Sequence, residues 1–81
     1  MSITERELQL LVLLCHNAPN AVARDTLSRA AAGHSWQPYE RTLDVHISHL
    51  RAKLMQVGCK KSIIMSHRGV GYSLQTEAAA G

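Results

Sequence analysis

Two histidines and one aspartate lie close together in residues 41–54, which read RTLDVHISHLRAKL. His46 and His49 are three residues apart, a spacing that can hold a metal ion on one side of a helix. No third ligand follows at a suitable spacing, so we expect no metal site and no cofactor. Asp44 lacks a second acid for general acid–base catalysis. We therefore expect no catalytic residue and no enzyme, and we expect Asp44 either to orient Arg41 or Arg51 or to exclude wrong bases.

The segment Arg68–Gly71 (RGVG) is a second candidate for chemistry. Glycine-rich loops bind phosphates when they open a helix, because the N–H groups of the helix N-terminus then surround the anion. This segment lies between two short β-type runs instead. It is therefore better explained as the turn of a hairpin than as a nucleotide site.

Positive charge is concentrated in the second half of the chain. The protein has 81 residues and a net charge of +3. Residues 1–40 carry three Lys/Arg and four Asp/Glu, a net of −1, whereas residues 41–81 carry six and two, a net of +4. A uniformly solvated surface gives no reason for this segregation, so the sequence predicts a basic face for an anionic partner.

Three helices must position these residues within one small domain, residues 1–76, followed by a frayed tail at residues 77–81. Thr4–Glu7 (TERE) fits a capping box, and the helix that it starts runs to about residue 17. A second helix is expected over residues 24–31. The third is expected over residues 40–57. Its core stripe has spacings of three and four residues and consists of Leu43, Ile47, Leu50, Leu54 and Val57.

The end of the chain predicts a β-hairpin. Residues 62–65 and 72–75 have strand character, and residues 67–71 form the turn between them. Ile3 could add a very short third strand. The fold class is then mainly α with a small β-hairpin, a winged helix-turn-helix in which the third helix enters a DNA groove and the hairpin, or wing, flanks it.

The first helix is apolar on nearly all sides, so a single neighbour cannot cover it. One expected stripe consists of Leu8, Leu11, Val12 and Cys15. Surplus apolar positions on the other faces are Leu10, Leu13 and Leu14. The two cysteines, Cys15 and Cys59, are too few for a disulfide framework and are expected as reduced thiols in a cytosolic protein. No apolar run reaches 18 residues and no secretory signal is visible, so we expect no membrane contact from this chain.

The outer face of the third helix has short side chains at its centre and cations at its rim. The centre carries Val45, Ser48 and Ala52, and the rim carries Arg41, Arg51 and Lys53. Short side chains let a helix approach another surface closely, and the two chemistries suit base edges and phosphates respectively. A solvated or partner-facing helix is the alternative at this point.

Three segments then occur in a familiar order: TEREL with paired leucines from residue 4, RTLDVHISHLRAKL at residues 41–54, and IMSHRGVGY at residues 64–72. In this order they resemble the first helix, the recognition helix and the wing of OmpR/PhoB-type winged-helix domains. Those are usually the C-terminal effector domains of bacterial two-component response regulators. The resemblance implies sequence-specific binding of double-stranded DNA, control of transcription and a cytoplasmic location.

The resemblance also implies roles for matching positions. Phosphate contacts are expected from Arg41, Thr42, His46 and Arg51. The positions nearest the bases are Asp44, Val45, Ser48 and His49. The wing would contact the DNA backbone through Ser66, Gly69 and Tyr72, and Arg68 would enter the adjacent minor groove. The loop residues His34, Ser35, Trp36 and Gln37 would face RNA polymerase. Other implied partners are a receiver domain and a second copy arranged head-to-tail on direct repeats.

Several positions depart from the family pattern. Ser48 and His49 stand where the family often has arginine, so affinity should be weaker and should rise as acidification charges His49. A tryptophan that often ends the second helix is replaced by Ala32. Only three residues precede Thr4 where the family has a four-stranded sheet. We expect that sheet to be missing, which leaves a fragment or a self-associating short form as explanations.

Two alternatives to a response regulator stay open. The winged helix could be a protein–protein module whose basic face is incidental. It could also be the cytoplasmic DNA-binding domain of a membrane-anchored one-component activator.

Overall fold

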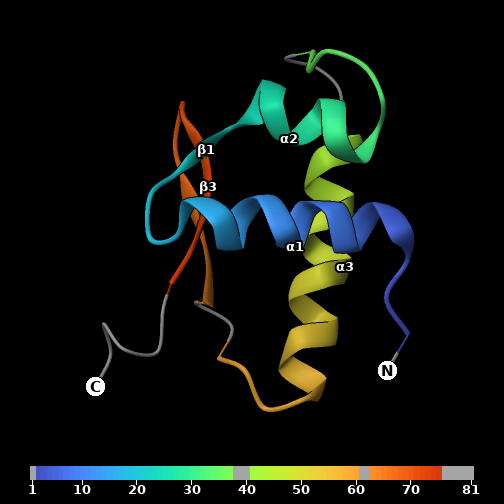
Figure 1. Cartoon of the computed structure of the whole chain (residues 1–81), viewed down its shortest axis with the longest axis vertical. Coiled ribbons are helices and arrows are strands. Elements are labelled where there is room, and N and C mark those ends of the chain that lie inside the picture. Colours follow the sequence, from blue (N-terminus) through green and yellow to red (C-terminus); the bar gives the residue numbers. More distant parts are fainter. Residues whose placement is uncertain (1, 38–40, 61–62, 76–81) are drawn as a thin grey trace.

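A computed structural model describes residues 2–37, 41–60 and 63–75. Its elements are α1 (Glu5–Asn17), β1 (Val22–Ala23), α2 (Arg24–Ala31), α3 (Thr42–Gln56), β2 (Ile64–His67) and β3 (Gly71–Leu74). In Figure 1, α1 crosses α3, α2 lies against one end of the pair, and the strands stand beside the helices. The predicted mainly α winged helix-turn-helix with a small hairpin is confirmed.

The start of α1 is fixed by the predicted capping box. The Thr4 side chain accepts from the Glu7 N–H at 3.2 Å, and Glu7 Oε1 accepts from the Thr4 N–H at 2.9 Å. Glu7 is only 2% exposed, and its Oε1 also accepts from Lys53 Nζ on α3 at 2.6 Å. Burial raises the pKa of Glu7, but the hydrogen bonds from Lys53 and Thr4 outweigh it and leave the pKa below its ordinary value. The cap of α1 is therefore also a tether to α3.

The core between the helices is aliphatic, with Tyr72 as its aromatic member. The other buried apolar residues are Leu10, Leu14, Val22, Leu27, Ala31, Leu43, Ile47, Leu50, Leu54 and Ile64. Four of the five positions predicted for the α3 stripe are among them. The prediction that Val57 is buried is wrong. Val57 is the C-cap of α3, where the backbone has left helical geometry, and it is 57% exposed.

The buried side of α1 differs from the predicted stripe, although Leu11 of that stripe packs, partly buried, against the core. Leu10 and Leu14, expected as surplus positions, are fully buried, whereas Leu8 and Val12 of the expected stripe are 50% and 46% exposed. Glu7 shares the inward face with the two leucines because positions 7, 10 and 14 follow helical spacing. The apolar surface of α1 that the described chain leaves open is therefore centred on Leu8 and Val12.

The third strand of the sheet is β1, and the prediction that Ile3 provides it is wrong. The strand order is β1-β3-β2, with Val22 opposite Tyr72 and Ala23 opposite Gly71. A Cβ added at Gly71 would lie 1.8 Å from the Val22 carbonyl oxygen, so glycine is what lets β1 approach β3. Ile3 instead packs, half-buried, against the core.

The hairpin is displaced slightly from the prediction. Strand β2 extends to His67, β3 begins at Gly71, and the turn is closed by the Val70 N–H, which donates to the His67 carbonyl at 2.9 Å. Gly69 has a φ of +77°, a conformation that suits glycine.

Parts of several predictions lie outside the described residues. These are the tail at residues 77–81, the start of the third helix at residue 40, and the start of the first hairpin strand at residue 62. None of the helices in the described chain is both long and apolar enough to cross a membrane.

Candidate nucleic-acid interface

One face of α3 is buried in the core and the opposite face is open. The open positions are Arg41, Thr42, Asp44, Val45, Ser48 and His49. Val45 is 47% exposed although it is apolar. His46 and Arg51 are half-buried beside this face. The predicted base-facing residues therefore lie on the accessible side of the helix.

The hairpin adds a second open surface. Ser66, Arg68 and Gly69 are exposed on the wing, while Tyr72 is only 5% exposed. The side chain of Tyr72 belongs to the core, and its hydroxyl donates a hydrogen bond to Asp44 Oδ1. Tyr72 therefore joins the wing to α3 from beneath the open surface.

Asp44 is held by Arg24 rather than by Arg41 or Arg51. Arg24 Nη1 donates to Asp44 Oδ1 at 3.0 Å, and Oδ1 also accepts from Tyr72. Burial raises the pKa of Asp44, but these two hydrogen bonds and the charges of Arg24 and Arg41 leave it below its ordinary value. The carboxylate is thus kept ionised at the start of α3.

Sequence reasoning missed Arg24, the first residue of α2. Its guanidinium carbon lies 5.0 Å from the centre of the Tyr72 ring and 5.7 Å from that of Trp36, distances typical of cation–π contacts. Burial lowers the pKa of Arg24, yet its bonds to Asp44 and Tyr72 raise it overall. The sequence signal that could have indicated this contact is Asp44, a single acid on a cationic helix. The sequence does not show which cation pairs with it.

Two of the three predicted rim cations of α3 serve the fold. Arg51 Nη2 donates to the Ile64 carbonyl of β2 at 2.6 Å, and Lys53 pairs with Glu7. Arg51 therefore ties α3 to the wing. Of the cations that the resemblance places on DNA, Arg41 and Arg68 are the two exposed ones.

The loop after α2 is tied back to that helix. Asp25 Oδ1 accepts from the Trp36 N–H at 3.1 Å and Asp25 Oδ2 from Arg29 Nε at 2.8 Å, while Arg29 Nη2 donates to Ser35 Oγ at 2.7 Å. Beside it, a hollow is lined by Ala23, Arg24, Asp25, Trp36, Asp44, Gly69 and Val70. This hollow joins the loop, α3 and the wing. His34 and Gln37 are exposed on the same loop, and Ser35 and Trp36 are half-buried.

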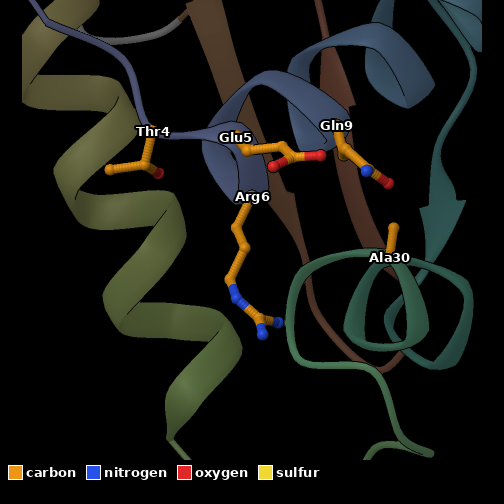
Figure 2. Close-up of a pocket in the computed structure, with 5 residues that line it drawn as sticks. All are labelled: Thr4, Glu5, Arg6, Gln9 and Ala30. Carbon is orange, nitrogen blue, oxygen red and sulfur yellow. The ribbon is translucent and has the colours of Figure 1, made fainter.

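A separate hollow lies between the first turns of α1 and the end of α2. Figure 2 shows the residues that line it: Thr4, Glu5, Arg6, Gln9 and Ala30. The Arg6 guanidinium donates a hydrogen bond to the carbonyl of Ala31, the last residue of α2. Within residues 2–37, 41–60 and 63–75, no three His, Cys, Asp or Glu side chains gather as a metal site.

Three helices, a three-stranded sheet and an open third helix beside a wing define the winged helix-turn-helix class. The chain belongs to the family described as "Transcriptional regulatory protein, C terminal", whose model matches residues 1–74.

Similar proteins include a CpxR homolog of Haemophilus influenzae, described as a transcriptional regulatory protein. It is 38% identical over 76 residues, which cover 94% of this chain and 34% of that protein. The alkaline phosphatase synthesis transcriptional regulatory protein PhoP of Bacillus subtilis is 35% identical over 75 residues, covering 93% of this chain and 31% of that protein. This chain thus spans about a third of the length of these relatives.

Two solved structures share the fold. The DNA-binding domain of CpxR from E. coli matches with a TM-score of 0.81 and 32% identity, over 94% of this chain and 74% of that chain. The Klebsiella pneumoniae RstA DNA-binding domain in complex with the RstA box matches with a TM-score of 0.76 and 26% identity, over 91% and 73%. The predicted family resemblance is therefore confirmed.

Proposed function

We propose that this chain is the DNA-binding effector domain of a two-component response regulator and binds double-stranded DNA sequence-specifically. One observation carries the proposal: the open, short-chained face of α3 lies on the same domain as an exposed wing arginine, in a fold that a relative uses on DNA. The assignment to response regulators rests on the family and on relatives such as CpxR and PhoP.

In this proposal α3 lies in the major groove. Val45, Ser48 and His49 approach base edges, while Arg41 and Thr42 contact phosphates at the start of the helix. His46 lies at the edge of the open face and is assigned to the phosphate backbone as well.

The wing supplies the second contact. Arg68 enters the adjacent minor groove, where narrow A·T-rich stretches attract arginine, and Ser66 and Gly69 approach the backbone. Arg51 and Tyr72 act mainly through the fold in this proposal, because their polar groups bond to Ile64 and Asp44.

Further partners are proposed from the family. Two domains would sit head-to-tail on direct repeats, with a receiver domain in the full-length regulator, in the bacterial cytoplasm. The loop residues His34, Ser35, Trp36 and Gln37 would face RNA polymerase. The hydrogen bond from Arg29 to Ser35 supports a loop of defined conformation.

Selection of bound duplexes from a random pool tests the proposal. A single preferred motif, present twice at a fixed spacing, is expected. If the domain neutralises about five phosphates, the logarithm of the association constant falls with the logarithm of salt concentration at a slope of about −4 to −5. Recovery of no motif from a folded protein would contradict sequence-specific binding.

Charge-matched variants separate this function from a protein–protein module. Arg41→Ala should reduce the steepness of the salt slope by about one, because one phosphate contact is lost. Arg29→Ala is the matched control, since it removes the same charge from α2, where Arg29 pairs with Asp25. Unchanged DNA binding by the double variant Arg41→Ala/Arg68→Ala would contradict the proposed interface.

A further inference from the structure

Four separate segments of the chain meet at Arg24. It is the first residue of α2, and it contacts Asp44 of α3, Tyr72 of β3 and Trp36 of the loop after α2. Its backbone N–H also donates to the Val70 carbonyl of the wing at 3.2 Å.

The guanidinium geometry explains why one side chain can serve all of them. Nη1 donates to Asp44 Oδ1, while the cation lies within 6 Å of the centres of two aromatic rings. A planar, permanently charged guanidinium suits both a carboxylate and ring faces, whereas a lysine ammonium is a compact point charge. The site is therefore matched to arginine rather than to positive charge alone.

The carboxylate of Asp44 needs such a partner. Asp44 lies in the first turn of the proposed recognition helix, and its side chain is 47% exposed. An unpaired acid there would repel DNA phosphates, while the Arg24 side chain beside it is only 23% exposed. Arg24 therefore offsets the charge of Asp44 from the protein side.

We propose that Arg24 is a positioning residue for DNA recognition: by holding Asp44, Tyr72 and Trp36 together, it fixes the recognition helix against the wing and couples both to the loop at residues 34–37. The inference rests on the proposed function. Its mechanism is orientation, because Arg24 acts through Asp44 and Tyr72 and is itself mostly covered.

The first readout is selectivity. Arg24→Ala should weaken binding to the selected duplex by about tenfold, because Asp44 loses a charge-assisted hydrogen bond and α3 loses its tie to α2. Binding to a random duplex should weaken no more than in Arg29→Ala, the matched control that removes one charge from the same helix. Arg24→Lys keeps the charge but not the planar fork, so it should retain random-duplex binding and lose part of the selectivity.

The second readout is the fluorescence of Trp36, the single tryptophan of the chain. Arg24→Ala uncovers the indole, so the emission of the free protein should shift to longer wavelength. In the wild type, binding of the selected duplex should change the emission, because the cluster links α3 to the loop. In both Arg24 variants that change should be reduced.

The possible outcomes distinguish failure of the Arg24 positioning role from failure of the proposed DNA-binding function. A wild-type chain that binds no selected duplex would contradict the proposed function. Wild-type selectivity and an unaltered Trp36 response in folded Arg24→Ala would overturn the positioning role. If Arg24→Ala does not fold, as judged by circular dichroism, Arg24→Lys decides by the same two readouts: wild-type values overturn the role and reduced values support it.

Discussion

The two ends of α3 use charge in different ways. Near its C-terminus, Lys53 pairs with a glutamate that is 2% exposed, and Arg51 donates to a wing carbonyl. Near its N-terminus, Arg41 is exposed and Asp44 is held by Arg24 at a half-open site. The first set holds the helix in the domain, and the second leaves a shaped, charged surface. A cation-rich helix can thus be an anchor at one end and leave a charged, accessible surface at the other, which is the surface that we propose contacts DNA.

Loss of the buried pair should have the largest effect on stability. Glu7→Gln should lower the free energy of unfolding by about 2 kcal/mol, because it weakens the capping box and leaves Lys53 without a counter-charge. The cost stays below that of a fully buried pair, since the Lys53 side chain is 26% exposed and can be hydrated. Urea unfolding measures the change, and DNA affinity of the folded variant should match the wild type. A weaker affinity in folded Glu7→Gln would argue against the division between the two ends.

Asp44→Asn should affect stability less and recognition more. The free energy of unfolding should fall by only about 1 kcal/mol, because asparagine keeps an acceptor and the site is partly hydrated. Selection from a random pool should return an altered or weaker motif. A motif and affinity identical to the wild type would show that Asp44 has no part in recognition.

The free energy of unfolding should decrease at acidic pH, because the carboxylates of Glu7 and Asp44 become protonated. The folded pKa values of Glu7 and Asp44 lie below their ordinary values of 4.5 and 3.8, so each stabilises the fold above its unfolded pKa. That contribution is lost as the pH falls below about 4.5 and through the folded pKa values. Unfolding in urea as a function of pH measures it, and Glu7→Gln should flatten the curve more than Asp44→Asn. A steeper loss in Glu7→Gln than in the wild type would contradict this sign.

The exposed pair on α2 should matter least. Arg29→Ala breaks the contacts to Asp25 and Ser35, but both partners of the ion pair are more than half exposed. We expect a thermal midpoint and a DNA affinity close to those of the wild type. A large loss of affinity in this variant would extend the interface onto α2 and the following loop.

Local sequence features were sufficient for much of the fold. The capping box fixed the start of α1, and the three- and four-residue spacing identified the buried face of α3 as far as Leu54. Both signals are encoded within one or two helical turns, so they do not depend on distant partners.

The remaining features depend on contacts across the chain. Strand β1 has two residues and pairs with a segment about 50 residues away, so no local pattern marks it. Leu8 and Leu10 are chemically alike, and only the positions of α3 and the sheet decide which is buried. Arg24 pairs with Asp44, which lies 20 residues later in the sequence. The exposed face of α3 could therefore be predicted from helical spacing, whereas the ion pair that holds Asp44 could not.

The proposal that DNA lies against α3 and the wing is tested most directly by titrating the isotope-labelled chain with the selected duplex and monitoring the amide chemical shifts. We predict the largest shifts at residues 41–49, at the start of α3, and at residues 66–70 of the wing, with smaller shifts at Arg24 and Trp36. The exposed Leu8 and Val12 side of α1 should shift little. Shifts centred on α1, with α3 and the wing unaffected, would contradict it.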